Sequence, residues 1–197
     1  MTICVLFYGD HPDLCRRFFD SLHRYTDPLR YDLRVGLNEV GDETRDIVSG
    51  TASRVGGHAV VFDEPVNIYK YPLMRKMFFH PPIQSEWTIW FDDDSHLTAP
   101  GWLESLDRRI EAEPQAEMFG GKYFIEVKRP TVEFIESAPW YRGIPVRKDR
   151  PDDLPPGDDC DGVIEFITGG FWALRTRTIV ALDWPDRRLV HNGGDKT

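Results

Sequence analysis

The chain has 197 residues, 41% of them hydrophobic, which is enough to bury the core of one folded domain. Its formal net charge of −9 disfavours binding to nucleic acid or anionic lipid and makes a divalent cation the easier partner. The three cysteines, Cys4, Cys15 and Cys160, are odd in number and lack C-x-x-C spacing, which argues against a disulfide framework and a zinc site and favours a cytoplasmic location.

The first part of the chain predicts two successive pairs of a strand and a helix. Residues 2–8, TICVLFY, form a β-prone run without a basic segment ahead of it, so we expect a first strand and no signal peptide. A helix at 14–25, a strand at 31–40 and a helix at 42–54 follow. This order is typical of a parallel βαβ unit.

The same alternation continues to the end of the chain. We expect strands at 58–64, 87–91 and 117–128 and helices at 69–79 and 100–113. Residues 137–161 are dense in Pro, Gly, Asp and Arg, which predicts a long loop that is a candidate lid. Order then resumes as a strand, a turn at Gly169 and Gly170, and a helix. No stretch approaches the roughly 18 apolar residues of a membrane span.

The apolar stretch WTIWF leads directly into Asp92, Asp93 and Asp94. A buried strand does not tolerate unpaired carboxylates, so these side chains must face water, a cation or each other where the strand leaves the core. Strand alternation would turn Asp92 and Asp94 toward one site and Asp93 away from it. Carboxylate oxygens suit Mg²⁺ or Mn²⁺, and a diphosphate would complete the shell of such an ion.

Further candidates follow the other strands, because ligands of open parallel sheets bind beyond the carboxyl ends. They are Tyr8, Gly9 and Asp10 after the first strand, and Asn38 and Glu39 after the second. Arg75 and Lys76, on the helix before the aspartates, could neutralise phosphates. Each has a simpler interpretation: Asp10 as a helix N-cap, Asn38 as a turn residue, and the two cations as part of a solvated face.

Three segments occur in an order that resembles a known family: FDDDSHLTAPGW, ITGGFWALRT and HNGGD. Together they are similar to the nucleotide-sugar-dependent glycosyltransferases of the GT-A fold, particularly family 2-like members, over essentially the whole chain. The resemblance implies an α/β, Rossmann-like single domain at 1–197, with a central, mostly parallel mixed sheet flanked by helices. It also implies Mn²⁺- or Mg²⁺-dependent transfer of a sugar, with inversion, from a nucleotide-diphosphate donor to an acceptor hydroxyl. A UDP-sugar is the favoured donor, and the acceptor is left open.

The same resemblance implies roles for individual residues. Asp92 would meet the donor, Asp94 would bind the metal together with Asp92, and Asp93 would lie beside the donor. The acceptor would lie against Gly169, Gly170, Phe171 and Trp172, and Asp195 would be the catalytic base. Only Lys196 and Thr197 follow Asp195, so we expect either that the chain is truncated there or that its site is completed differently.

Two other classes of protein remain open. A haloacid dehalogenase-like phosphohydrolase also places Asp-x-Asp after a strand, with the first aspartate as covalent nucleophile. In that family the motif opens the first strand, whereas three strands are expected before it here. A non-catalytic nucleotide-sugar-binding module would keep Asp92 and Asp94 but would not need Asp195. The simplest interpretations make the aspartates a solvated turn and place Phe171 and Trp172 in the core.

Overall fold

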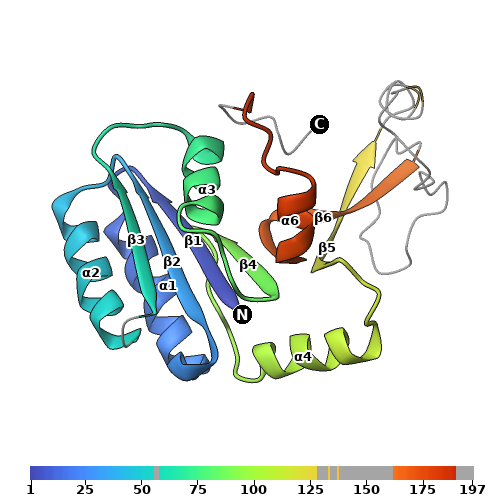
Figure 1. The fold of residues 1–197 in the computed structure, drawn as a ribbon, viewed down its shortest axis with the longest axis horizontal. Helices are drawn as coiled ribbons and strands as arrows, with labels where there is room; N and C mark the ends of the chain where they lie inside the picture. Colours follow the sequence, from blue (N-terminus) through green and yellow to red (C-terminus); the bar gives the residue numbers. More distant parts are fainter. Residues whose placement is uncertain (56–57, 128–132, 134–136, 138–161, 190–197) are drawn as a thin grey trace. The chain divides into compact units, whose positions relative to one another are not determined.

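The computed structural model describes residues 1–55, 58–127, 133, 137 and 162–189 (Figure 1). The chain divides into two compact units, one formed by Met1–Phe119 with Gly169–Thr197 and the other by Gly120–Thr168. The first unit contains nearly all the elements that position the candidate site. The single-domain organisation expected from the sequence stays a prediction.

The order of strands and helices agrees with the sequence prediction. The elements are β1 (Thr2–Tyr8), α1 (Pro12–Tyr25), η1 (Pro28–Arg30), β2 (Asp32–Asn38), α2 (Asp42–Ala52), η2 (Ser53–Val55), β3 (Ala59–Glu64), α3 (Lys70–Phe79), β4 (Trp87–Asp92), α4 (Trp102–Ala112), β5 (Met118–Val127), β6 (Gly162–Arg175) and α6 (Thr176–Ala181). The predicted loop at 137–161 lies outside the described residues except for Ser137. None of the helices in the described ranges has the length and hydropathy needed to cross a membrane.

The strands form one mixed sheet in the order β3-β2-β1-β4-β6-β5. β1 pairs in parallel with β2 and β4, and β2 pairs in parallel with β3, whereas β4 and β6 are antiparallel. This confirms the expected α/β architecture with a mostly parallel sheet. The register aligns Tyr8 with Asn38 and Leu6 with Asp92, so the carboxyl ends of β1, β2 and β4 meet at one edge.

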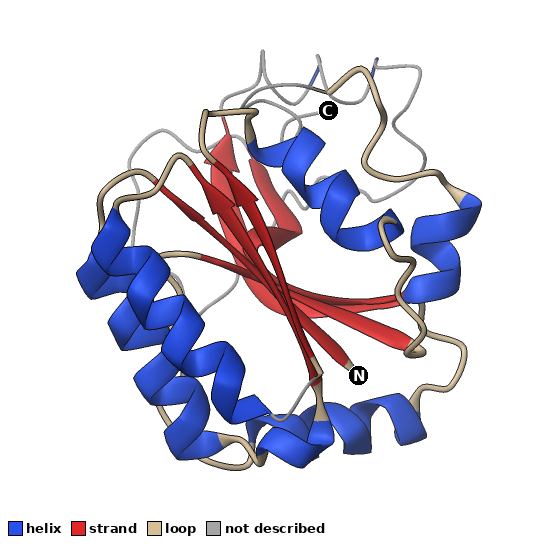
Figure 2. Cartoon of the chain, turned by 60° about the vertical axis from the view of Figure 1, so that its left-hand side comes forward, coloured by secondary structure: helices blue, strands red, loops and turns tan. Residues whose placement is uncertain are grey.

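Alternate strand residues pack against helices on opposite faces of the sheet, and Figure 2 shows helices on both sides. The odd-numbered residues of β1, β2 and β4 join a buried cluster with side chains of α1, α2 and α4. On the other face, Trp90 meets Phe78 of α3 edge to face, with ring centroids 6.0 Å apart. The near-continuous apolar sequences of these strands follow from this two-sided burial.

A buried arginine fixes the end of α3 to the sheet. Arg34 of β2 has only 7% of its surface exposed. Its guanidinium donates to the carbonyl of Met77 and to the carbonyls of Pro81 and Pro82, at 2.6 and 3.3 Å. Burial lowers the pKa of Arg34. Carbonyls at a helix end lack intrahelical partners, so the guanidinium supplies one to Met77 and ties the prolines that follow the helix to the same side chain.

The expected turn at Gly169 and Gly170 is wrong, because both residues lie inside β6. The strand continues through them and pairs with β4 from Phe171 to Arg175. The Gly170 carbonyl accepts a hydrogen bond from Ser95 Oγ at 3.1 Å. Glycine in a strand commonly marks a close approach of another segment, and here that segment is the turn after β4.

Asp10 is not the N-cap of α1, contrary to the simpler of its two interpretations. The helix begins at Pro12, and its N-cap residue is His11, whose side chain makes no capping hydrogen bond. Proline is favoured at the first helical position because its fixed φ already suits the helix. The start of α1 is therefore set by Pro12, one residue later than capping by Asp10 would allow.

Two of the cysteines are buried free thiols. Cys4 lies on β1 and Cys15 on α1, and both are fully buried. Desolvation raises the pKa of each thiol to about 12. Both therefore act as small apolar side chains, while Cys160 lies outside the described residues.

Gly36 leaves the space that α3 occupies against β2. A Cβ atom at this position would lie 2.7 Å from Met77 Sδ and 3.1 Å from Leu73 Cδ2, both in fully buried side chains. We expect Gly36→Ala to lower the free energy of unfolding by about 1–3 kcal/mol in urea titrations followed by circular dichroism, because the packed helix cannot recede freely.

The matched control is Gly50→Ala in α2, where a Cβ would have no neighbour within 4 Å. The free energy of unfolding of this variant should rise by up to about 1 kcal/mol, because alanine is the better helix former. An unfolding midpoint for Gly36→Ala at or above that of the wild type would contradict the packing argument.

Candidate functional site

The carboxyl ends of β1, β2 and β4 surround a pocket of about 250 Å³. Its lining residues are Leu6, Tyr8, Asn38, Asn67, Tyr69, Lys70, Asp92 and Asp93. Four of these were named as donor-binding candidates from the sequence: Tyr8, Asn38, Asp92 and Asp93, although strand alternation was expected to turn Asp93 away. The structure therefore brings residues from three strand ends and from the start of α3 to one place, as the position of ligands in open α/β sheets requires.

Asp92, the last residue of β4, is neutralised inside the protein. The ammonium of Lys70 lies 3.0 Å from Oδ1 and 3.3 Å from Oδ2 of this carboxylate. The indole Nε1 of Trp90 donates to Oδ1 at 2.8 Å. The Lys70 and Asp92 side chains are 20% and 30% exposed, so this ion pair is only partly screened by water.

Asp92 has a cation beside it, whereas Asp93 is subject mainly to burial and to neighbouring negative charges. Burial raises its pKa, and the negative charges of Asp92 and Asp94 raise it further. The carboxyl group thus lies partly buried beside two other carboxylates, and both conditions disfavour its charged form. A cation bound at this position would relieve that repulsion.

Strand alternation was expected to turn Asp93 away from the site and Asp94 toward it. This expectation is wrong, because the strand does not continue to these two residues. β4 ends at Asp92, and the Ser95 amide donates to the Asp92 carbonyl at 3.0 Å, which closes a turn. Strand alternation therefore does not extend to the next two residues. Asp93 lines the pocket, and Asp94 is exposed beside it.

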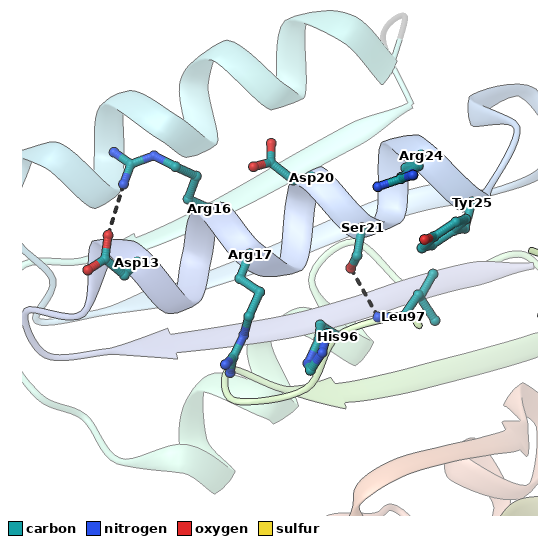
Figure 3. A pocket seen from close by; sticks show the side chains of 9 residues that line it. All are labelled: Asp13, Arg16, Arg17, Asp20, Ser21, Arg24, Tyr25, His96 and Leu97. Carbon is teal, nitrogen blue, oxygen red and sulfur yellow. Dashed lines mark hydrogen bonds and ion pairs between the residues drawn. The ribbon is translucent and has the colours of Figure 1, made fainter. Parts of the chain in front are cut away.

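The turn after β4 is fixed by its neighbours. Arg17 of α1 donates to the Asp94 carbonyl at 2.9 Å, and the Leu97 amide donates to Ser21 Oγ at 3.0 Å. Arg17 and Ser21 also line a separate open groove of about 420 Å³. Figure 3 shows both side chains on α1, with Ser21 joined to Leu97. With Ser95 bonded to β6, the turn is attached on two sides, which fixes the backbone of the aspartates.

Asn38 acts on the pocket through the loop that precedes α3. It is 2% exposed; its Nδ2 donates to Asn67 Oδ1 at 3.0 Å and its Oδ1 accepts from the Ile68 amide at 2.9 Å. Asn67 Oδ1 also accepts from the Tyr69 amide at 2.7 Å. Tyr69 adopts a φ of 68°, an uncommon conformation for a non-glycine residue, which these bonds hold in place. The next residue is Lys70, so this amide clamp positions the pocket's cation.

Gly9, Asp10 and Glu39 lie near this edge but are not among the lining residues. Gly9 has a φ of 69°, and its amide faces the Asn38 carbonyl at 3.4 Å. Glu39 has a φ of 56°, and its amide donates to the Glu64 carbonyl at 2.9 Å. These residues shape the turns that follow β1 and β2.

Arg75 and Lys76 have internal partners away from the pocket. Arg75 donates to Asp183 Oδ1 at 2.7 Å and to the carbonyls of Asp183 and Pro185. Lys76 pairs with Glu64 at 2.6 Å. Both cations thus join parts of the fold together, and neither is a lining residue.

The aromatic residues of β6 pack inside the protein. Trp172 is 4% exposed and stacks on Trp90, with centroids 6.0 Å apart. Phe171 lies 5.0 Å from Phe91 and 6.4 Å from Trp102, centroid to centroid. The side chain of Trp172 is therefore part of the core that supports Asp92 through Trp90. Asp195 lies outside the described residues.

Sequence reasoning missed Asn67, Tyr69 and Lys70. One signal could have pointed to Lys70: it is the first residue of a helix, where the positive end of the helix dipole disfavours a cation. A lysine at this position is therefore expected to have a carboxylate nearby. The amide clamp had no such signal, because Asn38 and Asn67 come together only through the fold.

The pocket offers part of a metal-binding shell. Within the described ranges, no three His, Cys, Asp or Glu side chains are grouped closely enough to hold a metal ion by themselves. The aspartate turn nevertheless supplies hard carboxylate oxygens from neighbouring side chains, Asp92 and Asp93 among them. Mg²⁺ and Mn²⁺ commonly take one or two carboxylates and complete their shell with water and substrate phosphates. The donor set thus fits such an ion when a phosphate ligand joins it.

Comparison with solved structures identifies the fold as that of the GT-A-like glycosyltransferases. The mannosyltransferase PcManGT from Pyrobaculum calidifontis, in complex with GDP-Man and Mn²⁺, matches 92% of this chain and 46% of its own, with a TM-score of 0.60 and 15% identity. Residues 1–349 of S. aureus TarS match 100% of this chain and 53% of their own, with a TM-score of 0.60 and 12% identity. The same TarS fragment in complex with UDP-GlcNAc gives a TM-score of 0.54 at 12% identity.

The chain thus spans about half the length of these structures. A comparison with protein families gives no match, and neither does a comparison with curated protein sequences. At these identities the likeness concerns the fold. The chemistry must be argued from the pocket.

The amide clamp can be tested with Asn38→Ala. The substitution removes the partners of the Ile68 amide and of Asn67, and we expect it to lower the free energy of unfolding by about 1–3 kcal/mol. Hydrogen exchange at the Ile68 and Tyr69 amides should become faster at the same time. Gln84→Ala, which removes an exposed amide, is the control and should change stability by less than about 0.5 kcal/mol. Unchanged exchange at Ile68 in Asn38→Ala would refute the clamp.

Proposed function

We propose that this protein is a nucleotide-sugar-dependent glycosyltransferase that binds the donor diphosphate and a divalent cation, Mn²⁺ or Mg²⁺, in the pocket at the carboxyl edge. The observation that carries the proposal is the joint presence of Asp92, Asp93 and Lys70 in one pocket of a GT-A-like fold. A diphosphate needs positive charge and a metal ion needs carboxylates, and this pocket supplies both.

The known ligands of two structural neighbours support the choice of substrate class. One neighbour is a complex with GDP-Man and Mn²⁺ and another a complex with UDP-GlcNAc. The pocket volume of about 250 Å³ lies just below the usual range of roughly 300–1,000 Å³ for small-molecule sites. We therefore assign the pocket to the diphosphate region of the donor, with a UDP-sugar as the favoured donor.

In this proposal each residue has a separate role. Asp94 and Asp92 would hold the cation, and such an ion would supply Lewis-acid stabilisation of the leaving diphosphate. Asp195 accepts the proton of the acceptor hydroxyl, because a neutral hydroxyl is a weak nucleophile. Attack opposite the leaving group inverts the anomeric centre. The aspartate turn is held in place by two hydrogen bonds. Arg17 of α1 donates to the Asp94 carbonyl, and Ser95 donates to the Gly170 carbonyl of β6.

Substitution of Asp94 tests the metal role. The bond from Arg17 goes to the backbone carbonyl of Asp94, so Asp94→Ala deletes the carboxylate without deleting the contact that holds the turn. We expect Mn²⁺-dependent binding of UDP-GlcNAc or GDP-mannose, measured by calorimetry, to fall below detection. Asp42→Ala, which removes a fully exposed carboxylate at the start of α2, should leave binding unchanged. Equal donor affinity with and without Asp94 would refute the assignment.

Substitution of Asp195 separates catalysis from binding. In Asp195→Asn we expect donor binding to persist and sugar transfer to be lost, because the amide cannot accept the proton. The assay measures metal-dependent release of nucleoside diphosphate in the presence of candidate acceptors. A binding module would show no turnover even in the wild type, and a phosphohydrolase would show turnover without a nucleotide-sugar. Retained transfer in Asp195→Asn would remove the base assignment.

A further inference from the structure

We propose that Lys70 is an exchangeable counter-ion: it pairs with Asp92 in the free protein and turns to the donor diphosphate when a divalent cation occupies the aspartate turn. Lys70 would then couple the two binding events, because it opposes binding of the metal alone and favours binding of the metal together with the nucleotide. This inference rests on the proposed function for the identity of the ligand.

The charges at the pocket favour such an exchange. Lys70 is the one cationic side chain among the described lining residues; it pairs with Asp92, and Asp93 lines the same pocket. Arg17, the other cation at the turn, is bonded to the backbone carbonyl of Asp94. One ammonium against the two lining carboxylates, with Asp94 exposed beside them, leaves negative charge that a divalent cation can compensate. A diphosphate that joins the metal brings new negative charge, and Lys70 is then the side chain in the pocket that can compensate it.

The carboxylate of Asp92 stays in place when Lys70 leaves, because a second donor holds it. Trp90 Nε1 donates to Oδ1 at 2.8 Å, and Trp90 is fully buried. Its ring stacks on Trp172 at an interplanar angle of 11° and meets Phe78 edge to face. A rigid core residue thus orients the carboxylate, and the ion pair with Lys70 can open without loss of that orientation.

Lysine is suited to this change of partner. Its ammonium is a point charge on a flexible four-carbon stem, so it can move between two anions in one pocket while the backbone stays fixed. The backbone at Lys70 is anchored by the Asn38 and Asn67 clamp and by the first turn of α3. The ammonium is 5.8 Å from the centroid of the Trp90 ring, whose face also favours a cation.

The test uses Lys70→Met, which keeps most of the side-chain volume and removes the charge. Binding of Mn²⁺ alone, measured by electron paramagnetic resonance of the free ion, should become tighter by about 3-fold or more, since the competing charge is gone. Binding of UDP-GlcNAc or GDP-mannose in the presence of Mn²⁺, measured by calorimetry, should weaken by about 10-fold or more. The matched control is Lys76→Met, whose ammonium pairs with Glu64 outside the pocket, and it should change neither value.

A second variant tests the same exchange from the other side. Asp92→Asn keeps an oxygen for Trp90 Nε1 but no longer pairs with an ammonium. It should bind Mn²⁺ more weakly and, without metal, bind UDP or GDP more tightly than the wild type does, because Lys70 is free to meet phosphate. Circular dichroism melting curves would identify a variant that fails to fold, in which case the other variant decides.

The outcomes separate this inference from the proposed function. A wild-type protein that binds no nucleotide or nucleotide-sugar, with or without Mn²⁺, removes the proposed function and this inference with it. The exchange alone is overturned if the wild type binds the donor and Lys70→Met has a lower affinity for both Mn²⁺ and donor. It is also overturned if the wild type binds the donor and Lys70→Met changes neither affinity. Metal-free nucleotide binding that is unchanged in Asp92→Asn also overturns it.

Discussion

The carboxylate of Asp92 stands at the end of a buried strand, and the protein must compensate its charge before any ligand arrives. It does so with the ammonium of Lys70 and the indole Nε1 of Trp90. Several surrounding residues hold these two partners of Asp92 in place. Trp90 is held by the stacked ring of Trp172 and by Phe78. Trp172, which follows the two glycines, thus supports the site from inside the core.

The position of Lys70 depends in turn on how α3 is attached. At the end of the helix, Arg34 of β2 binds the carbonyls of Met77 and of the residues that follow the helix. At its beginning, the clamp formed by Asn38 and Asn67 holds the loop, with Tyr69 at a positive φ. Both anchors come from β2, the strand on which Gly36 leaves room for the helix. This strand therefore contributes a residue to the anchor at each end of the helix that carries the pocket's cation.

The fold and the site support the functional proposal in different ways. The likeness to PcManGT and to TarS places the chain among GT-A-like folds, at low identity and over about half of their lengths. The pocket contributes the chemistry: the carboxylates that follow β4, one ammonium among the described lining residues, and a turn fixed to α1 and β6. The proposed ligand, a metal-bound diphosphate, carries charges that complement that arrangement.

The sequence by itself determined the order of the elements, the mostly parallel sheet and the edge at which the aspartates emerge, because these follow from local periodicity and from the apolar run before Asp92. It also selected Tyr8 and Asn38 as strand-end residues. Only the tertiary structure decided that Asn38 is a buried clamp, that Gly169 and Gly170 lie within a strand, and that Lys70 neutralises Asp92 while Arg75 and Lys76 pair elsewhere. Such pairings join residues distant in sequence, and their partners are set by strand register and helix packing, which no local pattern encodes.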